Sequence, residues 1–272
     1  MYQLPIFNSS LSTSASNEIV GYWKWTNNQS NPAPLQTRYQ RQNCRGAKTS
    51  KKECLESGSM DRFSSYSYEF LNSNFIQYHN LQKNNELKIC AGGQSHARFL
   101  SNHLSLILTD LNITSIEIGH VPLSYPREMS SRRIINRAKL CNITILGLGQ
   151  WSAGKKPRKV IPATLFEDYF KELEQGILFW KKNNINFFFR KTHYNPLGDI
   201  KNTCPPTDWR SPSVIDGYNE ITRFLTKKHN ITFIESGSVI DAMWDSAEDF
   251  CHYSGKEGRT EALFFLQKIL NN

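Results

Sequence analysis

The stretch LKICAGGQSHARFLSNHLSLILTDL, residues 87–111, decides the fold of this chain. It opens with a short, largely apolar run that ends at two glycines, which is typical of a buried strand followed by a tight turn. Between positions 96 and 111 the apolar residues recur at the spacing of one helix face. Ser95 lies in the turn between the two patterns. The stretch therefore predicts a strand, a glycine turn and a helix.

The same alternation continues along the chain after residue 111. Further strands are expected at 115–118, 143–148, 185–189 and 231–234, and further helices at 164–183, 218–229 and 257–270. Strands separated by helix-length segments indicate a parallel sheet that is covered on both faces. We therefore predict an α/β fold, a three-layer α/β/α sandwich around a central, mainly parallel five-stranded sheet. In such folds the active site lies outside the carboxyl ends of the strands.

The region before this sheet has a different character. Residues 1–17 are rich in Ser and Asn and are predicted to be disordered. Residues 18–85 lack strong periodicity and predict a loop-rich N-terminal lobe that wraps the core, with Cys44 and Cys54 as candidates for a disulfide. Residues 86–272 form the predicted α/β domain.

Composition limits the class of protein. The chain has 272 residues, of which 39% are hydrophobic and 12% aromatic, values that suit a globular core. No apolar run approaches the roughly 20 residues needed to span a bilayer, and no signal-peptide pattern is visible at the start. Six cysteines and five Asn-x-Ser/Thr triplets, at Asn8, Asn28, Asn112, Asn142 and Asn230, nevertheless favour a lumenal or extracellular location.

The net charge of +9 is concentrated in two basic stretches, 127–139 and 155–159. One interpretation is solvated surface, and the other is a positive rim that attracts an acidic partner. No recognised nucleic-acid-binding motif accompanies the charge, so nucleic acid is not the expected partner.

Three short motifs carry candidate chemistry. In Gly93-Gln94-Ser95 the serine would sit at a helix N-terminus, where its hydroxyl is exposed and its backbone N–H can join an oxyanion hole; the alternative is an ordinary helix cap. Gly149-Gln150-Trp151 follows a strand, and the Gln150 amide can donate to an oxyanion; the alternative is a plain turn. Asp249-x-x-His252 precedes the last helix and predicts a general base with its supporting acid.

In this order the motifs resemble those of the SGNH/GDSL hydrolase superfamily, which has Gly-Asp-Ser and Asp-x-x-His blocks. The chain is most similar to the PC-esterase-like branch, which includes trichome-birefringence-like and sialate-type glycan O-acetyltransferases. Residues 93–98 match the Gly-Asp-Ser-x-x-Arg block of that branch except at Gln94, and residues 149–151 match its Gly-x-Trp element. Upstream elements of the branch are echoed by residues 21–23 and 39–44. Two departures are Gln94 in place of aspartate and Gln150 in place of asparagine.

The resemblance implies an SGNH-hydrolase-like, flavodoxin-like domain and a site built on Ser95, His252 and Asp249. It implies an oxyanion hole formed by Ser95, Gly119 and Gln150. It implies a carbohydrate-directed enzyme in the Golgi lumen or outside the cell. Further residues are expected to bind substrate: Arg98, Trp151 and His193, of which Arg98 can instead anchor a loop and His193 can instead cap one.

The expected mechanism passes through an acyl-Ser95 intermediate. With water as acceptor the enzyme is an acetylesterase, and with a sugar hydroxyl it is an O-acetyltransferase. No tightly bound cofactor or metal is expected, although an acetyl donor would act as co-substrate, supplied by a separate membrane partner. The glycan can be acidic, given the basic stretches. Competing hypotheses are a catalytically inactive SGNH-fold glycan-binding protein, motivated by Gln94 and Gln150, and a cytosolic hydrolase or basic nucleic-acid-binding protein.

Overall fold

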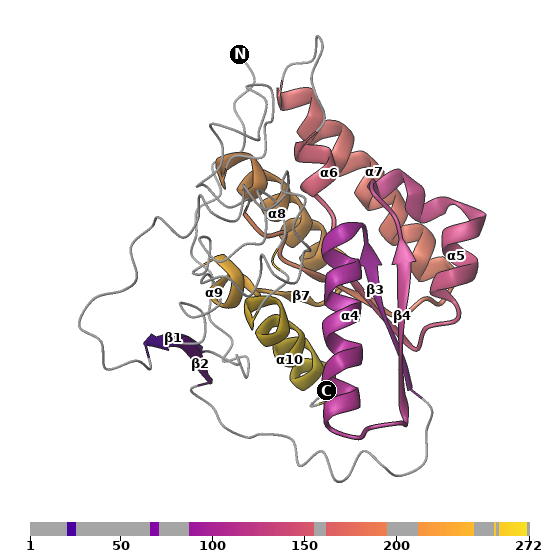
Figure 1. Cartoon of the computed structure of the whole chain (residues 1–272). Coiled ribbons are helices and arrows are strands. Elements are labelled where there is room, and N and C mark those ends of the chain that lie inside the picture. Colours follow the sequence, from indigo (N-terminus) through magenta and orange to yellow (C-terminus); the bar gives the residue numbers. More distant parts are fainter. Residues whose placement is uncertain are drawn as a thin grey trace, which may run out of the picture.

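The computed structural model describes residues 21–25, 66–70, 87–154, 162–194, 212–241, 253 and 256–270. Its centre is a parallel sheet with the spatial order β4-β3-β5-β6-β7 (Figure 1). The five strands are β3 (Leu87–Gly93), β4 (Ile116–Pro122), β5 (Ile143–Leu146), β6 (Phe187–Arg190) and β7 (Phe233–Ile234). The predicted five-stranded parallel sheet is thus confirmed.

Helices cover both faces of the sheet. One face carries α4 (Ser95–Asp110), α9 (Gly237–Ile240) and α10 (Lys256–Leu270), and α4 and α10 pack against each other (Figure 1). The other face carries the 3-10 helix η2 (Pro126–Ser130) and the helices α5 (Arg132–Ala138), α6 (Gln150–Ala153), α7 (Pro162–Lys182) and α8 (Pro212–Lys228). None of the helices within the described residues is both long and apolar enough to cross a membrane.

The alternation of side chains along the strands explains why two separate cores form. In β6, Phe187 and Phe189 join the cluster under α7 and α8, whereas Phe188 joins the cluster under α4 and α10. Successive side chains of a strand point to opposite faces, so an all-apolar strand needs a cover on each side. The three-layer α/β/α architecture follows, as the sequence predicted.

The observed strands differ from the predicted ranges at their ends, and two of these differences bear on the site. β3 continues beyond Ala91 to Gly93, because it pairs with β4 over its whole length, up to the register pair of Gly93 with Pro122. β5 ends at Leu146 rather than at Leu148, because the chain turns immediately afterwards toward Gly149, which has a φ of +126°.

The basic stretch 127–139 also contains structure that was not expected from its charge. It spans most of η2 and all of α5. Ser131 caps α5 by accepting a hydrogen bond from the Ile134 N–H at 3.3 Å, and Ile134, Ile135 and Ala138 are buried. The arginines at 132, 133 and 137 stay exposed. The stretch is therefore an amphipathic element with a basic outer side.

Part of the predicted N-terminal lobe is described. The strands β1 (Gly21–Trp25) and β2 (Tyr66–Phe70) form an antiparallel pair within the region 18–85. The rest of that region, the predicted disordered segment 1–17 and the candidate pair of Cys44 and Cys54 lie outside the described residues.

A disulfide joins the middle of β3 to the turn before β5. It links Cys90 to Cys141, whose Cα atoms are 5.9 Å apart. Gly119 of β4 is the register partner of Cys90, and a Cβ atom at Gly119 would lie 2.7 Å from the Cys90 Sγ. A side chain at position 119 would therefore collide with the disulfide, so glycine is required there for space.

Candidate active site

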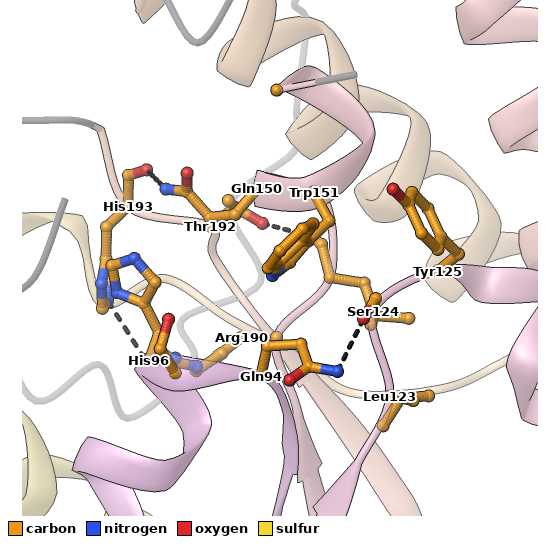
Figure 2. Close-up of a pocket in the computed structure, with 15 residues that line it drawn as sticks. Gln94, His96, Leu123, Ser124, Tyr125, Gln150, Trp151, Arg190, Thr192 and His193 are labelled. Carbon is orange, nitrogen blue, oxygen red and sulfur yellow. Dashed lines mark hydrogen bonds between the residues drawn. The ribbon is translucent and has the colours of Figure 1, made fainter. Parts of the chain in front are cut away.

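A cavity of about 360 Å³ opens at the carboxyl ends of four strands (Figure 2). Its lining residues follow these strands directly: 94–96 after β3, 123–125 after β4, 147–151 after β5, and Arg190, Thr192 and His193 at the end of β6. Gly154 completes the lining. Ligands of open parallel sheets bind at this edge, where the winding of the chain reverses. In this sheet the reversal lies at β3, because β4 and β5 flank it on opposite sides.

The glycine turn before Ser95 is shaped by the close approach of β3 and β5. Gly93 has a φ of +145°, a conformation that strongly favours glycine. A Cβ atom at Gly93 would lie 2.8 Å from the carbonyl oxygen of Gly147. The two strand ends can therefore meet at this distance only because residue 93 has no side chain.

Ser95 is the first residue of α4 and lines the cavity. The N-cap position belongs to Gln94, so the alternative that Ser95 is the helix cap is wrong. No described residue hydrogen-bonds to the Ser95 hydroxyl. The first N–H groups of a helix have no intrahelical partner, and the helix dipole favours negative charge beside them. Ser95 thus combines a hydroxyl that can react with a backbone N–H that can stabilise an oxyanion.

Gln94, the residue before Ser95, holds the turn after β3 in place. Its Nε2 donates a 2.6 Å hydrogen bond to the hydroxyl of Ser124 (Figure 2). The Ser124 N–H in turn donates to the Glu128 carboxylate at 2.8 Å. The glutamine that replaces the aspartate of the Gly-Asp-Ser pattern therefore links the loops after β3 and β4.

His120 supports the same turn from β4. Its Nε2 lies 3.0 Å from the Gly93 carbonyl oxygen, to which it donates. Burial lowers the pKa of His120, the hydrogen bond to Gly93 opposes this, and the charges of Arg98 and Arg137 lower the pKa further. His120 thus has a structural role, as a neutral side chain.

Of the residues expected to form the oxyanion hole, Gly119 does not line the cavity, whereas Gln150 does. Gly119 is in the middle of β4 beside the disulfide and is not among the residues that line the cavity, which takes Leu123, Ser124 and Tyr125 from the end of that strand instead. The predicted strand 115–118 in fact continues to Pro122, so Gly119 lies inside β4 and not in a loop after it.

Gln150 and Trp151 do line the cavity, at the start of α6. The Gln150 Nε2 donates to the backbone carbonyl of His193, whereas its Oε1 is buried with no hydrogen-bond partner among the described residues. Trp151 stands at the rim with 51% of its surface exposed. The amide thus holds the loop after β6 in position, and the indole offers an exposed apolar face.

Three further hydrogen bonds, all made by Thr192, tie the loop after β6 to its neighbours. The Thr192 hydroxyl donates to the Leu148 carbonyl, and Asn219 of α8 accepts from the Thr192 N–H at 2.8 Å and donates to its carbonyl at 3.1 Å. Gly149 has no side chain at this contact, where a Cβ atom would lie 2.9 Å from the Thr192 hydroxyl. The loops after β5 and β6 form one rigid wall as a result.

A buried charged network stands behind this wall. The Nε2 of His193 lies 2.6 Å from the Oε1 of Glu261, and Arg190 donates to the same oxygen at 2.8 Å. All three side chains are at most 5% exposed. Burial opposes ionisation of Glu261, but the charge of Arg190, together with the hydrogen bonds from Arg190 and His193, holds its pKa at about 2.

The sequence reasoning found His193 but missed Arg190 and Glu261. Arg190 carried a signal, since a charged residue ends the otherwise apolar run of β6. Glu261 carried none, because one more acidic residue in a C-terminal helix is ordinary. Only the packing of α10 against the sheet brings it to His193.

The remaining predicted residues divide into two groups. Arg98 is exposed on the first turn of α4 and is not among the residues that line the cavity. Asp249 and His252 lie outside the described residues. Tyr253, the next residue after His252, is buried, packs edge-on against the His193 ring at 5.8 Å between centroids and donates to the Tyr194 carbonyl at 3.1 Å. The structure thus brings Ser95, Gln150, Trp151 and His193 together around one cavity.

Solved structures share this architecture. An acetyl xylan esterase is 15% identical with a TM-score of 0.50, covering 67% of this chain and 100% of that one. A catalytic mutant of an acetylxylan esterase from Geobacillus stearothermophilus is 12% identical with a TM-score of 0.51, covering 69% and 96%. A gut microbial diltiazem-metabolizing enzyme is 14% identical with a TM-score of 0.52, covering 68% of this chain and 47% of that one.

At these identities the likeness establishes the fold alone, a three-layer α/β/α sandwich that this chain shares with those structures. No protein-family model matches the sequence, and no curated protein sequence does so either.

Proposed function

We propose that the protein is a serine-dependent acyl-ester enzyme that acts on acylated carbohydrate. The observation that carries the proposal is the position of Ser95. It begins a 16-residue helix at the carboxyl edge of a parallel sheet, lines a cavity, and has a hydroxyl that no described residue engages. A hydroxyl in that position can attack a carbonyl while its own N–H holds the developing oxyanion.

In the proposed reaction His252 removes the Ser95 proton, and Asp249 orients the imidazole. The Ser95 Oγ attacks the acyl carbon, the carbonyl oxygen becomes an oxyanion, and collapse releases the first alcohol with the proton returned by His252. The Ser95 N–H and the amide hydrogen of Gln150 that does not bind His193 are the proposed oxyanion donors. One such donor is typically worth about 3–4 kcal/mol.

The second acceptor decides the class of enzyme. Water would release the acid and make the protein an acetylesterase, whereas a sugar hydroxyl would make it an O-acetyltransferase with an acetyl donor as co-substrate. The fold shared with acetylxylan esterases supports acetyl-ester chemistry on carbohydrate in either direction. The rival proposal is an inactive glycan-binding protein, because Gln94 and Gln150 replace residues of the motif.

An oxidising, lumenal or extracellular location is part of the proposal. The disulfide between Cys90 and Cys141 is of the kind that persists in such compartments. Asn112, Asn142 and Asn230 of the sequence triplets are exposed, so a glycan can be attached to each. Occupied sites in native material, detected by mass spectrometry, would support this location, and free thiols with bare asparagines would contradict it.

A fluorophosphonate probe tests the nucleophile directly. The wild-type protein is expected to be labelled at Ser95, and Ser95→Ala should abolish labelling without changing the thermal unfolding temperature. Ser101→Ala, a serine of the same helix that hydrogen-bonds to the Arg98 carbonyl, is the matched control and should label normally. Absence of labelling in the folded wild type would favour the inactive glycan-binding alternative.

Mass spectrometry after incubation with an acetyl donor separates the two enzyme classes. An acetyl group on Ser95 that passes to an added xylo-oligosaccharide identifies a transferase. An adduct that decays to acetate at the same rate with or without the sugar identifies an esterase. If no adduct forms and no acetyl ester is cleaved, the proposed mechanism is wrong.

A further inference from the structure

The most constrained side chain of the cavity wall is His193, which the proposed mechanism does not use. Its Nε2 lies 2.6 Å from the Oε1 of Glu261 and 3.2 Å from an amino nitrogen of Arg190. Arg190 itself donates to the same carboxylate oxygen at 2.8 Å. Two donors therefore converge on one oxygen, which accounts for the contact between them.

This arrangement decides which nitrogen of His193 carries the proton. Glu261 stays ionised because, although burial opposes its charge, Arg190 and His193 hold its pKa at about 2. An ionised carboxylate only accepts hydrogen bonds, so Nε2 must be the protonated nitrogen. In the neutral ring Nδ1 then carries a lone pair, and no described residue donates to it. His193 lines the cavity, so Nδ1 is the atom it has left for a ligand.

The ring is also fixed in orientation. Gln150 holds the His193 carbonyl, and the rings of His96 and Tyr253 pack edge-on against the imidazole at centroid distances of 5.5 and 5.8 Å. An acceptor that is already held in place loses little conformational freedom when a ligand binds. The Glu261–Arg190 pair is thus a positioning device, and His193 is the group that would touch the ligand.

The same cavity contains an apolar surface for the body of a ligand. The Trp151 indole lines the cavity (Figure 2), and 51% of its surface is exposed. The volume of about 360 Å³ lies at the small end of the range for ligand pockets. A single sugar ring with a hydroxyl on one side and C–H groups on the other has the matching chemistry.

We infer that His193 and Trp151 form a subsite for one carbohydrate ring: Nδ1 of His193 accepts a hydrogen bond from a ring hydroxyl, and the apolar face of the ring packs on the indole. This inference rests on the proposed function in assigning a carbohydrate. It identifies Nδ1 of His193 as the atom that recognises the sugar hydroxyl. It also assigns Glu261 and Arg190 as the residues that fix the tautomer of His193.

Binding of unesterified sugar tests the subsite apart from catalysis. The folded wild-type protein is titrated by NMR with methyl β-xylopyranoside and with its monodeoxy analogues, each lacking one ring hydroxyl. The parent sugar should bind about tenfold tighter than one of the analogues, the difference that one hydrogen bond in a desolvated site typically gives. The ¹⁵N resonance of His193 Nδ1 should move only with the sugars that keep that hydroxyl.

Two substitutions at position 193 test the roles of the two ring nitrogens separately. His193→Gln places an amide near Nε2, where it can still donate to Glu261, but has no acceptor at Nδ1; it should bind the parent sugar and the critical analogue equally. His193→Asn places its amide oxygen near Nδ1 and should restore part of the discrimination. His229→Gln is the matched control, because His229 also pairs with a glutamate, Glu174 at 2.8 Å, but does not line the cavity, so the variant should bind like wild type.

The inference is overturned if the wild-type protein binds no sugar, or if it binds every monodeoxy analogue as tightly as the parent sugar. It is also overturned if His193→Gln still distinguishes the parent sugar from the critical analogue. Should the glutamine variant not fold, the nitrogen resonance of the wild type alone decides, since an unmoved Nδ1 excludes the contact. Sugar binding through His193 without Ser95 labelling would keep the subsite and refute the enzyme. Ser95 labelling without sugar binding would do the reverse.

Discussion

Glu261 and His193 meet at 2.6 Å although 68 residues separate them in the chain. One comes from the last helix and the other from the loop after β6, and both side chains are almost completely buried. The contact joins α10 to the wall of the cavity. The stability of the fold and the geometry of the candidate site therefore depend on the same pair.

Removing the Glu261 charge should destabilise the protein strongly. Glu261→Gln leaves the buried guanidinium of Arg190 without its counter-charge, and breaking such a pair typically costs about 3–5 kcal/mol. Urea unfolding measures the change. Glu220→Gln, which affects an exposed ion pair with Arg223, should cost less than about 1 kcal/mol. Equal losses for the two variants would show that the buried network is not a major source of stability.

The same carboxyl predicts an acid-sensitive stability. Its pKa is about 2 in the folded protein against an ordinary value of 4.5, so the unfolded chain takes up the proton first as the pH falls. The contribution is fully present above about pH 4.5 and is lost as the pH approaches 2. The difference in unfolding free energy between wild type and Glu261→Gln should therefore be constant from pH 7 to about 4.5 and shrink below it. A difference that changes between pH 5 and 7 would require another titrating group.

The disulfide should contribute strongly to stability. It closes a loop with a sequence separation of 51, for which loss of the cross-link is expected to cost about 2–5 kcal/mol. The double variant Cys90→Ala, Cys141→Ala, compared with wild type by urea unfolding in oxidising buffer, measures this. The two proteins should converge when wild type is unfolded with reductant. A double variant as stable as the oxidised wild type would contradict the role of the cross-link.

Gly119→Ala tests whether glycine is needed at position 119 to leave space for the disulfide or to form an oxyanion hole. The added Cβ would approach the Cys90 Sγ to 2.7 Å, so the variant should lose about 1–3 kcal/mol of stability. Because alanine keeps its backbone N–H, and because position 119 does not line the cavity, Ser95 labelling by the fluorophosphonate should persist in the folded fraction. A folded variant that loses its labelling would return Gly119 to the catalytic site.

Gly149→Ala should disturb the cavity wall itself. Residue 149 has a φ of +126°, and a Cβ atom there would lie 2.9 Å from the Thr192 hydroxyl. Backbone strain of this kind costs about 1–3 kcal/mol, and the displaced wall carries Gln150 and Trp151. Sugar binding and acyl-ester cleavage should both fall by more than the loss of folded protein, measured by thermal unfolding, accounts for. Glu220→Gln is the control, since its exposed ion pair with Arg223 is not part of the cavity lining and the substitution should leave sugar binding and ester cleavage unchanged.

Much of the fold was predictable because local patterns report burial. The apolar run of 87–91, the helical spacing after Ser95 and the phenylalanines of β6 each need cover on a known side, and the parallel three-layer sheet follows. The glycine turns at 93 and 149 could be expected for a second reason: both residues have a positive φ, a backbone conformation that strongly favours glycine. The rule that sites lie at carboxyl strand ends then brought Ser95, Gln150, Trp151 and His193 to one edge.

Other features depend on distances that no local pattern contains. Nothing near Glu261 distinguishes it from a surface glutamate, and the sequence pattern placed Gly119 after a strand, whereas β4 continues past it to Pro122 and the residue packs beside the disulfide. The sequence alone thus determined the layers of the fold and the nucleophile candidate, because both follow from periodicity and from backbone restrictions. Only the tertiary structure decided the partners of His193, the pairing of Cys90 and the place of Gly119, because each arises where segments far apart in the chain pack within a few ångströms.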